Sequence, residues 1–284
     1  MDLSLFWPPL VACLVIVAIH AYLGLHVIAR EVIFVDLALA QMAALGSVVA
    51  ILAHSAPGSG AAFGYSLGFT TLGAGLFSLT RTYTRGRVPH EAIIGIVYVV
   101  ASAAAILVAD RTPGAGEAIK DILVGGLLWV GWPAIGQLAV VYVLVGIFHW
   151  FFRHRFLTIS FDPEAAASKG WNVRWWDFLF YLSFGLVITF SVPIVGVLLV
   201  FSFLVVPAAI AFQFTTHRGV LAVLAWVAGA VASAGGLLVS FRYDLPTGPL
   251  VVCMFGLLLV VVSLVRRLVV GPPGTSGVRI DNPL

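Results

Sequence analysis

Five polar side chains lie within or at the ends of long apolar stretches, and they are the groups in this sequence best suited to bind a cation. They are His20, His26, Asp36, Gln41 and His54. Imidazole nitrogens and carboxylate or carbonyl oxygens bind divalent metal ions. Ionisable residues inside apolar segments are costly to bury and are functional candidates for that reason. We therefore treat these residues as candidate contacts for a metal ion.

Simpler roles stay open for the same residues. His20 and His26 are six residues apart, which is about 240° around a helix, so one helix cannot direct both rings at one ion. The alternative for each is a neutral histidine that hydrogen-bonds another helix. The alternative for Asp36 is a helix cap or an ion pair with Arg30. His54, at the outer end of its apolar run, is the candidate placed to meet an incoming ion.

The elements that must position these groups are membrane spans. The chain has 284 residues, of which 61% are hydrophobic and 10% charged. Soluble domains are about 45–50% apolar and about 25% charged, so lipid must cover much of this apolar surface. The sequence therefore predicts an all-α, polytopic transmembrane bundle over residues 1–270, followed by a flexible cytoplasmic tail, 271–284.

Eight or nine spans are expected from the apolar runs. The uncertainty has two sources: Gly131-Trp132-Pro133 interrupts one run after a short or re-entrant piece, and a break near Ser191-Val192-Pro193 divides another stretch. The nine runs are 4–29, 32–54, 61–80, 92–109, 122–152, 176–190, 194–214, 219–240 and 249–268.

The basic residues predict the orientation. With nine spans, all but three of the 15 lysines and arginines fall on the same side as Arg30; the exceptions are Arg111, Lys120 and Arg242. Cytoplasmic loops of membrane proteins carry an excess of lysine and arginine, so the Arg30 side is expected to be cytoplasmic. The scattered basic residues give no signal for a nucleic-acid partner. His149 is expected at the membrane interface.

A short capped helix is expected in the largest polar loop, at 162–170. Asp162 is a suitable N-cap, Pro163 suits the first helical position and Glu164 suits the first turn. Ala165 and Ala166 favour helix, and Gly170 suits the left-handed position that ends one. This segment is either an ordinary surface helix or a docking element for a cytoplasmic partner.

The sequence contains no motif that could power transport or catalyse a reaction. It has no GxxxxGK[ST] phosphate-binding loop and no signature of a hydrolase or metalloprotease. If the protein transports actively, ATP must be hydrolysed by another polypeptide.

Five stretches of the sequence form a recognisable set in their order along the chain. They run from Gly24 to Gly46, from Glu91 to Val97, from Ser160 to Gly170, from Gly196 to Ala211, and from Asp244 to Gly248. Together they resemble the membrane permease subunits of bacterial ABC importers for zinc, manganese and related divalent metals. The resemblance implies a multi-pass protein of the bacterial cytoplasmic membrane that forms a homodimer or pseudo-dimer and carries no cofactor of its own. It implies two further partners, a cytoplasmic ABC ATPase and an extracytoplasmic solute-binding protein, and makes 162–170 the ATPase-coupling helix.

The sequence departs from that family at one place that bears on the cargo. Family members often carry an Asp and a His four residues apart, where this chain has Leu37 and Gln41. Asp36 is one residue away, which rotates it by about 100° around a helix. A permease of the same architecture for another cargo, such as a metal chelate, is therefore an alternative. A membrane protein with no transport role is a further one.

Overall fold

The computed structural model describes residues 3–81, 88–111 and 124–270, and these residues form helices and turns with no strand among them. The predicted tail 271–284 and Lys120 lie outside the described residues. The helices are α1 (Leu3–Ala29), α2 (Val35–Leu52), α3 (Gly60–Thr80), α4 (His90–Asp110), η1 (Leu127–Trp129), α6 (Trp132–Phe151), α7 (Arg153–Phe161), α8 (Pro163–Ser168), α9 (Val173–Val195), α10 (Val197–Phe212), α11 (Arg218–Tyr243) and α12 (Thr247–Val270).

Seven helices of the described residues are long and apolar enough to cross a membrane: α1, α2, α4, α6, α9, α11 and α12. α10 is equally apolar but has only 16 residues. α3 has 21 residues and packs beside α2 and α9. Each of the nine predicted apolar runs overlaps one of these nine helices, although most of the helices extend beyond the predicted bounds. The prediction of an all-helical, multi-pass membrane protein is confirmed.

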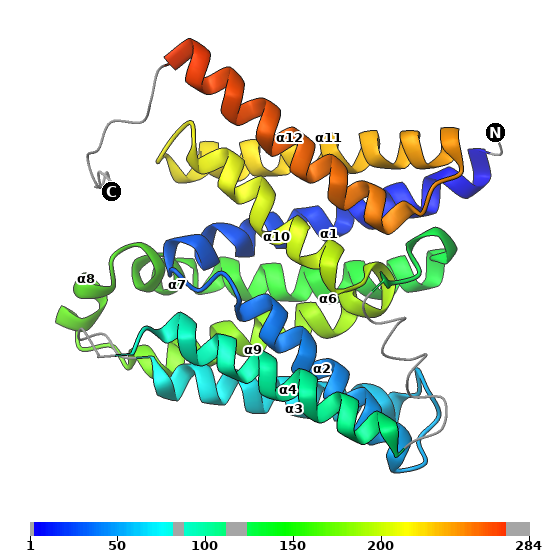
Figure 1. Cartoon of the computed structure of the whole chain (residues 1–284). Helices are drawn as coiled ribbons and strands as arrows, with labels where there is room; N and C mark the ends of the chain where they lie inside the picture. The colour runs from blue at the N-terminus through cyan, green and yellow to red at the C-terminus, as the bar shows by residue number, and fades with distance from the viewer. Residues whose placement is uncertain (1–2, 82–87, 112–123, 271–284) are drawn as a thin grey trace.

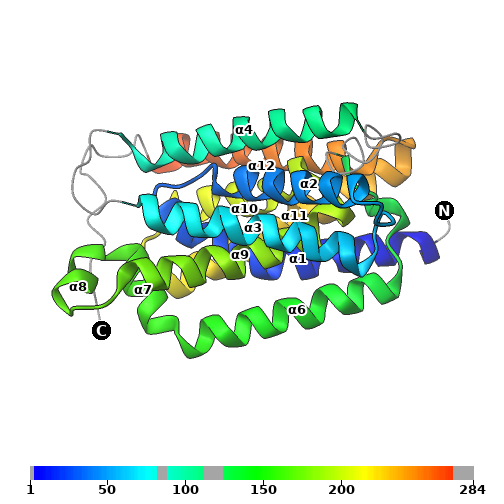
Figure 2. The ribbon, with the colours of Figure 1, turned by 90° about the horizontal axis from the view of Figure 1, so that it is seen from below.

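The long helices lie side by side along a common direction (Figures 1 and 2). α2 packs against α3, α4 and α9, whereas α1 packs against α6, α10 and α11. α7 and α8 lie at one end of the bundle, together with the α1–α2 and α10–α11 connections (Figure 1). Arg30, Arg153 and Arg218 are at this end, which we call the arginine-rich end. At the opposite end, Arg111 directly follows α4 and Arg242 lies in the last turn of α11.

The break between α9 and α10 corrects one sequence prediction. It was expected near Ser191-Val192-Pro193, but α9 continues through Pro193 and ends at Val195. Neighbouring helices make proline tolerable within a membrane helix. The chain turns instead at Gly196, whose φ of 78° is a conformation that glycine adopts without steric cost.

The irregular segment before α6 covers this break. The Gly126 amide donates to the Ile194 carbonyl at 2.9 Å, which gives that carbonyl a partner where the helix ends. Gly125 has a φ of 72°, and a Cβ there would overlap the backbone of Val195. The short or re-entrant piece expected before α6 contains η1 within the described residues.

Candidate functional site

A buried ion cluster joins three helices near the arginine-rich end. Nη1 of Arg30 donates to Oδ1 of Asp177 at 2.7 Å, and Nη1 of Arg81 donates to the same oxygen at 2.7 Å. The side chains of Arg30 and Asp177 are fully buried. Burying charges is costly unless they are paired and hydrogen-bonded, so the three groups depend on one another. The cluster ties the end of α1 to the end of α3 and the start of α9.

Ser160 connects this cluster to α7. Its hydroxyl oxygen accepts from Nε of Arg30 at 2.7 Å and is 2.8 Å from Nδ1 of His26. The Arg30 guanidinium also lies 3.9 Å from the centre of the Phe180 ring, a cation–π contact. α7 leads directly into α8, so a movement of α8 has a short, hydrogen-bonded route to the core of the bundle.

α8 has the capping that the sequence predicts. The Asp162 carboxylate accepts from the Ala165 amide at 3.0 Å, Pro163 begins the helix, and Gly170 has a φ of 66°. Ala166 is buried, whereas Glu164 is exposed to solvent. The predicted short helix is confirmed as a structural element, and part of its surface is open.

His20 lies in a second polar cluster, deeper in the bundle. Its Nε2 is 3.2 Å from the hydroxyl oxygen of Ser191, and Nδ1 donates to the Ile16 carbonyl at 3.0 Å. Ser191 is also 2.8 Å from the hydroxyl oxygen of Tyr142. Both ring nitrogens of His20 therefore have hydrogen-bond partners, as expected for a histidine that links helices. His26 bonds Ser160 through Nδ1, while its Nε2 has no partner in the part of the chain that the structure describes.

The α2 candidates lie far from one another. Asp36 is completely buried in the first turn of α2, and neither carboxylate oxygen has a hydrogen-bond partner among the described residues. It neither caps α2, whose N-cap is Phe34, nor pairs with Arg30, which bonds Asp177 instead. His54 follows the other end of α2 and is exposed. A helix of 18 residues is about 27 Å long, so these two groups cannot contact one ion.

Gln41 is buried on α2, one and a half turns after Asp36. Among the described residues, no group of three or more His, Cys, Asp or Glu side chains could hold a metal ion. The five sequence candidates are thus distributed along α1 and α2 and are not gathered into one centre.

The buried polar residues that were not identified as site residues from the sequence include Asp177, Ser160 and His149. Asp177 is a charged residue at the start of an apolar run, and the rule that selected Asp36 would have selected it as well. Ser160 carried no signal, because serine is common in loops. His149 was expected at the membrane interface but is buried, 3.2 Å from the Tyr22 hydroxyl oxygen and 2.9 Å from that of Ser183.

These features together define a multi-pass helical membrane protein with charged groups buried at one end of its bundle. The profile of the ABC 3 transport family matches residues 3–266, so the chain belongs to this family. The relatives described next are named as membrane proteins of metal transport systems, in agreement with the resemblance that the sequence shows.

Relatives in two bacteria illustrate the family. A protein of Chlamydia muridarum named as a probable metal transport system membrane protein is 24% identical over 178 residues, which are 63% of this chain and 61% of that relative's length. The manganese transport system membrane protein MntC of Listeria monocytogenes is 30% identical over 200 residues, which cover 66% of this chain and 70% of the relative.

The fold is shared with a solved structure, PsaBC from Streptococcus pneumoniae in complex with Fab. The TM-score is 0.74 at 20% sequence identity, and the match covers 90% of this chain and 89% of the other. The likeness extends over almost the whole bundle, so the arrangement of helices described above is also that of this solved structure.

Proposed function

We propose that this chain is the membrane-spanning subunit of an ATP-driven importer for a divalent metal ion, zinc or manganese, in a bacterial cytoplasmic membrane. The observation that carries the proposal is the family match over residues 3–266. The name of the Listeria monocytogenes relative favours manganese. In this proposal the chain has no catalytic residue, and the ATP is bound and hydrolysed by a separate cytoplasmic subunit. The match to a transport family speaks against a membrane protein without a transport role.

Two copies of the chain are proposed to enclose the path, with nine spans each. α4 and α12 support this arrangement, because only 17% and 11% of their apolar windows are buried within one chain. Both helices lie on the same side of the bundle (Figure 2). α2 packs directly behind α4. A second copy on this face would leave α2, with Asp36 and Gln41, close to the path between the copies, and His54 near its outer entrance, where a solute-binding protein would deliver the ion.

α8 is the proposed contact with the ATPase. Its exposed surface is available for docking, and its inner end continues through Asp162 into α7. Ser160 on α7 bonds both Arg30 and His26. A displacement of α8 on ATP binding would reach α1 through these hydrogen bonds. The residues proposed to form this coupling segment are Asp162, Pro163, Glu164, Ala165, Ala166 and Gly170.

Scrambling residues 163–168 tests the coupling segment, with the outer turn 55–58 scrambled as the matched control. We expect the α8 variant to be a folded membrane protein that no longer co-purifies with its ATPase, while the control retains it. Retention of the ATPase by a folded α8 variant would exclude this role.

A second cargo class, a metal chelate, remains a candidate because Leu37 and Gln41 replace the ligand pair common in the family. The two cargo classes, a free metal ion and a metal chelate, are distinguished by the stimulation of ATP hydrolysis in vesicles. These vesicles contain the chain, its ATPase and its solute-binding protein. Stimulation by free zinc, manganese or iron supports a metal ion as cargo. The absence of a response to all three ions, combined with a response to a chelate, favours the alternative.

A further inference from the structure

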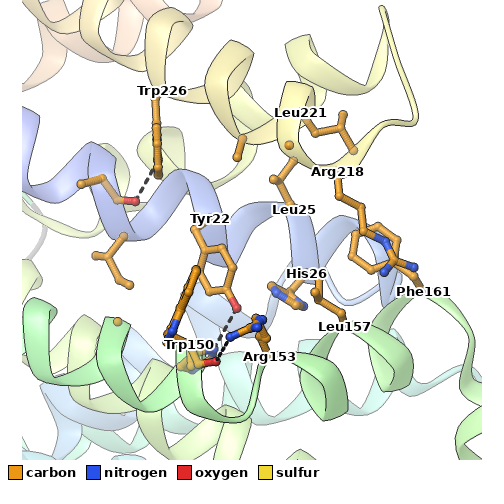
Figure 3. A pocket seen from close by; sticks show the side chains of 16 residues that line it. Tyr22, Leu25, His26, Trp150, Arg153, Leu157, Phe161, Arg218, Leu221 and Trp226 are labelled. Carbon is orange, nitrogen blue, oxygen red and sulfur yellow. Dashed lines mark hydrogen bonds between the residues drawn. The ribbon is translucent and has the colours of Figure 1, made fainter. Parts of the chain in front are cut away.

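A groove opens on the side of the bundle away from α4, between α6 and α11. α1 forms its floor, α7 closes it at the arginine-rich end, and its volume is about 420 Å³. Figure 3 shows Tyr22 and His26 on the floor, with Arg153 and Arg218 on opposite walls. We propose that this groove binds one anionic phospholipid, with the phosphate held by Arg153 and Arg218 and an acyl chain lying along α1.

The part of the groove away from the arginines has the chemistry of an acyl-chain site. The apolar lining includes Ile19 and Leu25 of α1 and Leu221 and Ala222 of α11. Trp226 of α11 leans across to α1, where its Nε1 donates to the Ala18 carbonyl at 2.9 Å, and so limits the groove on the side away from the arginines. The helices on both sides present exposed apolar side chains, including Val143 of α6 and Val223 of α11, each more than half exposed. In a membrane these side chains contact lipid, so lipid is the molecule available at the groove.

The inner end of the groove is positively charged. Arg153 and Arg218 are exposed, and no carboxylate within the described residues forms an ion pair with either. Their guanidinium groups rest on rings instead: Arg153 lies 4.4 Å from the centre of the Trp150 ring, and Arg218 lies 5.2 Å from that of Phe161. These contacts hold both side chains beside the groove without neutralising them. Arginine is well suited to phosphate because its planar donors can bind two oxygens.

Two further features favour an anion at this end. Arg218 is the first residue of α11, whose N-terminus has no side-chain cap, and helix N-termini attract phosphate. His26 lines the groove and is 1% exposed, and no described residue offers its Nε2 a hydrogen bond. A phospholipid suits both features. Its anionic head group suits the N-terminus of α11, and its glycerol and ester oxygens, next to the phosphate, suit Nε2 of His26. The orientation predicted from the basic residues places this site in the cytoplasmic leaflet, whose surface is negatively charged.

The proposal is tested by native mass spectrometry of the full chain, which reports bound lipid. The chain is stripped of lipid and then titrated with phosphatidylglycerol or phosphatidylcholine. We expect tighter binding of phosphatidylglycerol, at one site per chain. The double variant Arg153→Gln/Arg218→Gln should weaken phosphatidylglycerol binding by about fivefold per arginine, or about 25-fold in all, and weaken phosphatidylcholine, whose choline cation offsets the phosphate charge, by less. Arg266→Gln/Arg267→Gln, an equal loss of charge at the same end of the bundle, on α12, is the matched control and should bind as the native chain does.

Two further arms identify the occupant. Ala222→Phe fills the acyl-chain part without changing the charge and should also reduce phosphatidylglycerol binding. Because Arg153 and Arg218 are exposed, their variants keep the test valid if Ala222→Phe fails to fold. Inorganic phosphate should not displace the lipid. The proposal would be overturned if the two lipids bound equally well, or if the two double arginine variants lost the same amount of phosphatidylglycerol binding. Displacement of the lipid by phosphate alone would also overturn it, in favour of a free-phosphate site.

Discussion

Arg30 and Asp177, 147 residues apart in the sequence, meet at 2.7 Å inside the bundle with both side chains fully buried. Arg81 contacts the same carboxylate oxygen at the same distance. One carboxylate therefore accepts from two guanidinium groups and holds α1, α3 and α9 together beside α7. In the proposed coupling, a displacement of α8 passes through α7 to this buried cluster. The cluster's packing would then transmit the movement to α1, α3 and α9.

Asp177→Asn should strongly destabilise the protein. The substitution leaves two arginines near one another without their shared counter-ion, and breaking a buried pair costs about 3–5 kcal/mol. Thermal unfolding in detergent measures the effect. Asp110→Asn is the control, because its partner Arg111 is 3.7 Å away and both side chains are exposed. Equal unfolding temperatures for native chain and Asp177→Asn would show that the cluster does not stabilise the bundle.

Ser160→Ala should uncouple ATP hydrolysis from metal transport, and this effect should exceed its effect on the stability of the fold. Arg30 and His26 each lose a hydrogen bond to α7, at a cost of about 1–3 kcal/mol for buried groups left unsatisfied. With its ATPase bound, we expect the variant to hydrolyse ATP with little metal transport. Ser168→Ala is the matched control, since its hydroxyl bonds only within α8 and is exposed. Unchanged transport per ATP in Ser160→Ala would contradict the route through α7.

Asp36→Leu should raise the unfolding temperature and abolish transport. The carboxylate is completely buried, and neither oxygen has a hydrogen-bond partner within residues 3–81, 88–111 and 124–270, so an apolar side chain relieves an energetic cost. A residue retained at such a cost is expected to serve function rather than stability. Thermal unfolding and metal uptake are measured on the same preparation. Uptake at the native rate would remove Asp36 from the proposed path.

Gly125→Ala should destabilise the junction of α9 and α10, whereas Gly126→Ala should not. Gly125 has a positive φ, and a Cβ there overlaps the Val195 backbone; a Cβ on Gly126 meets nothing within 4 Å. Forcing a side chain into this position costs about 1–3 kcal/mol. Thermal unfolding of the two variants compares them directly. Equal stability would show that the contact is not close in solution.

The sequence predicted those features that depend on local chemistry. The apolar runs marked the long helices, and the side chain of Asp162 and the freedom of Gly170 marked both ends of α8. The break at Gly196 was displaced from its expected place, because proline is a weaker helix stop in a tightly packed bundle than in an isolated segment. Glycine at a positive φ was the deciding feature, and the sequence contains 29 glycines with no mark to distinguish this one.

The candidate site was less predictable, because its geometry is tertiary. No spacing rule connects Arg30 to Asp177 or His26 to Ser160, since each pair is separated by more than 100 residues. Intramembrane charge alone selected Asp36 correctly as a buried group but could not show that its oxygens lack partners.

The central claim is tested most directly by measuring ATP-driven movement of zinc or manganese across the membrane of vesicles. These vesicles contain the chain, its ATPase and its solute-binding protein. The account predicts movement of at least one of these ions only when the chain, the ATPase and ATP are all present, and its loss when residues 163–168 are scrambled. Failure to move either ion with all components present and folded, or movement that survives the scrambling of α8, would contradict it.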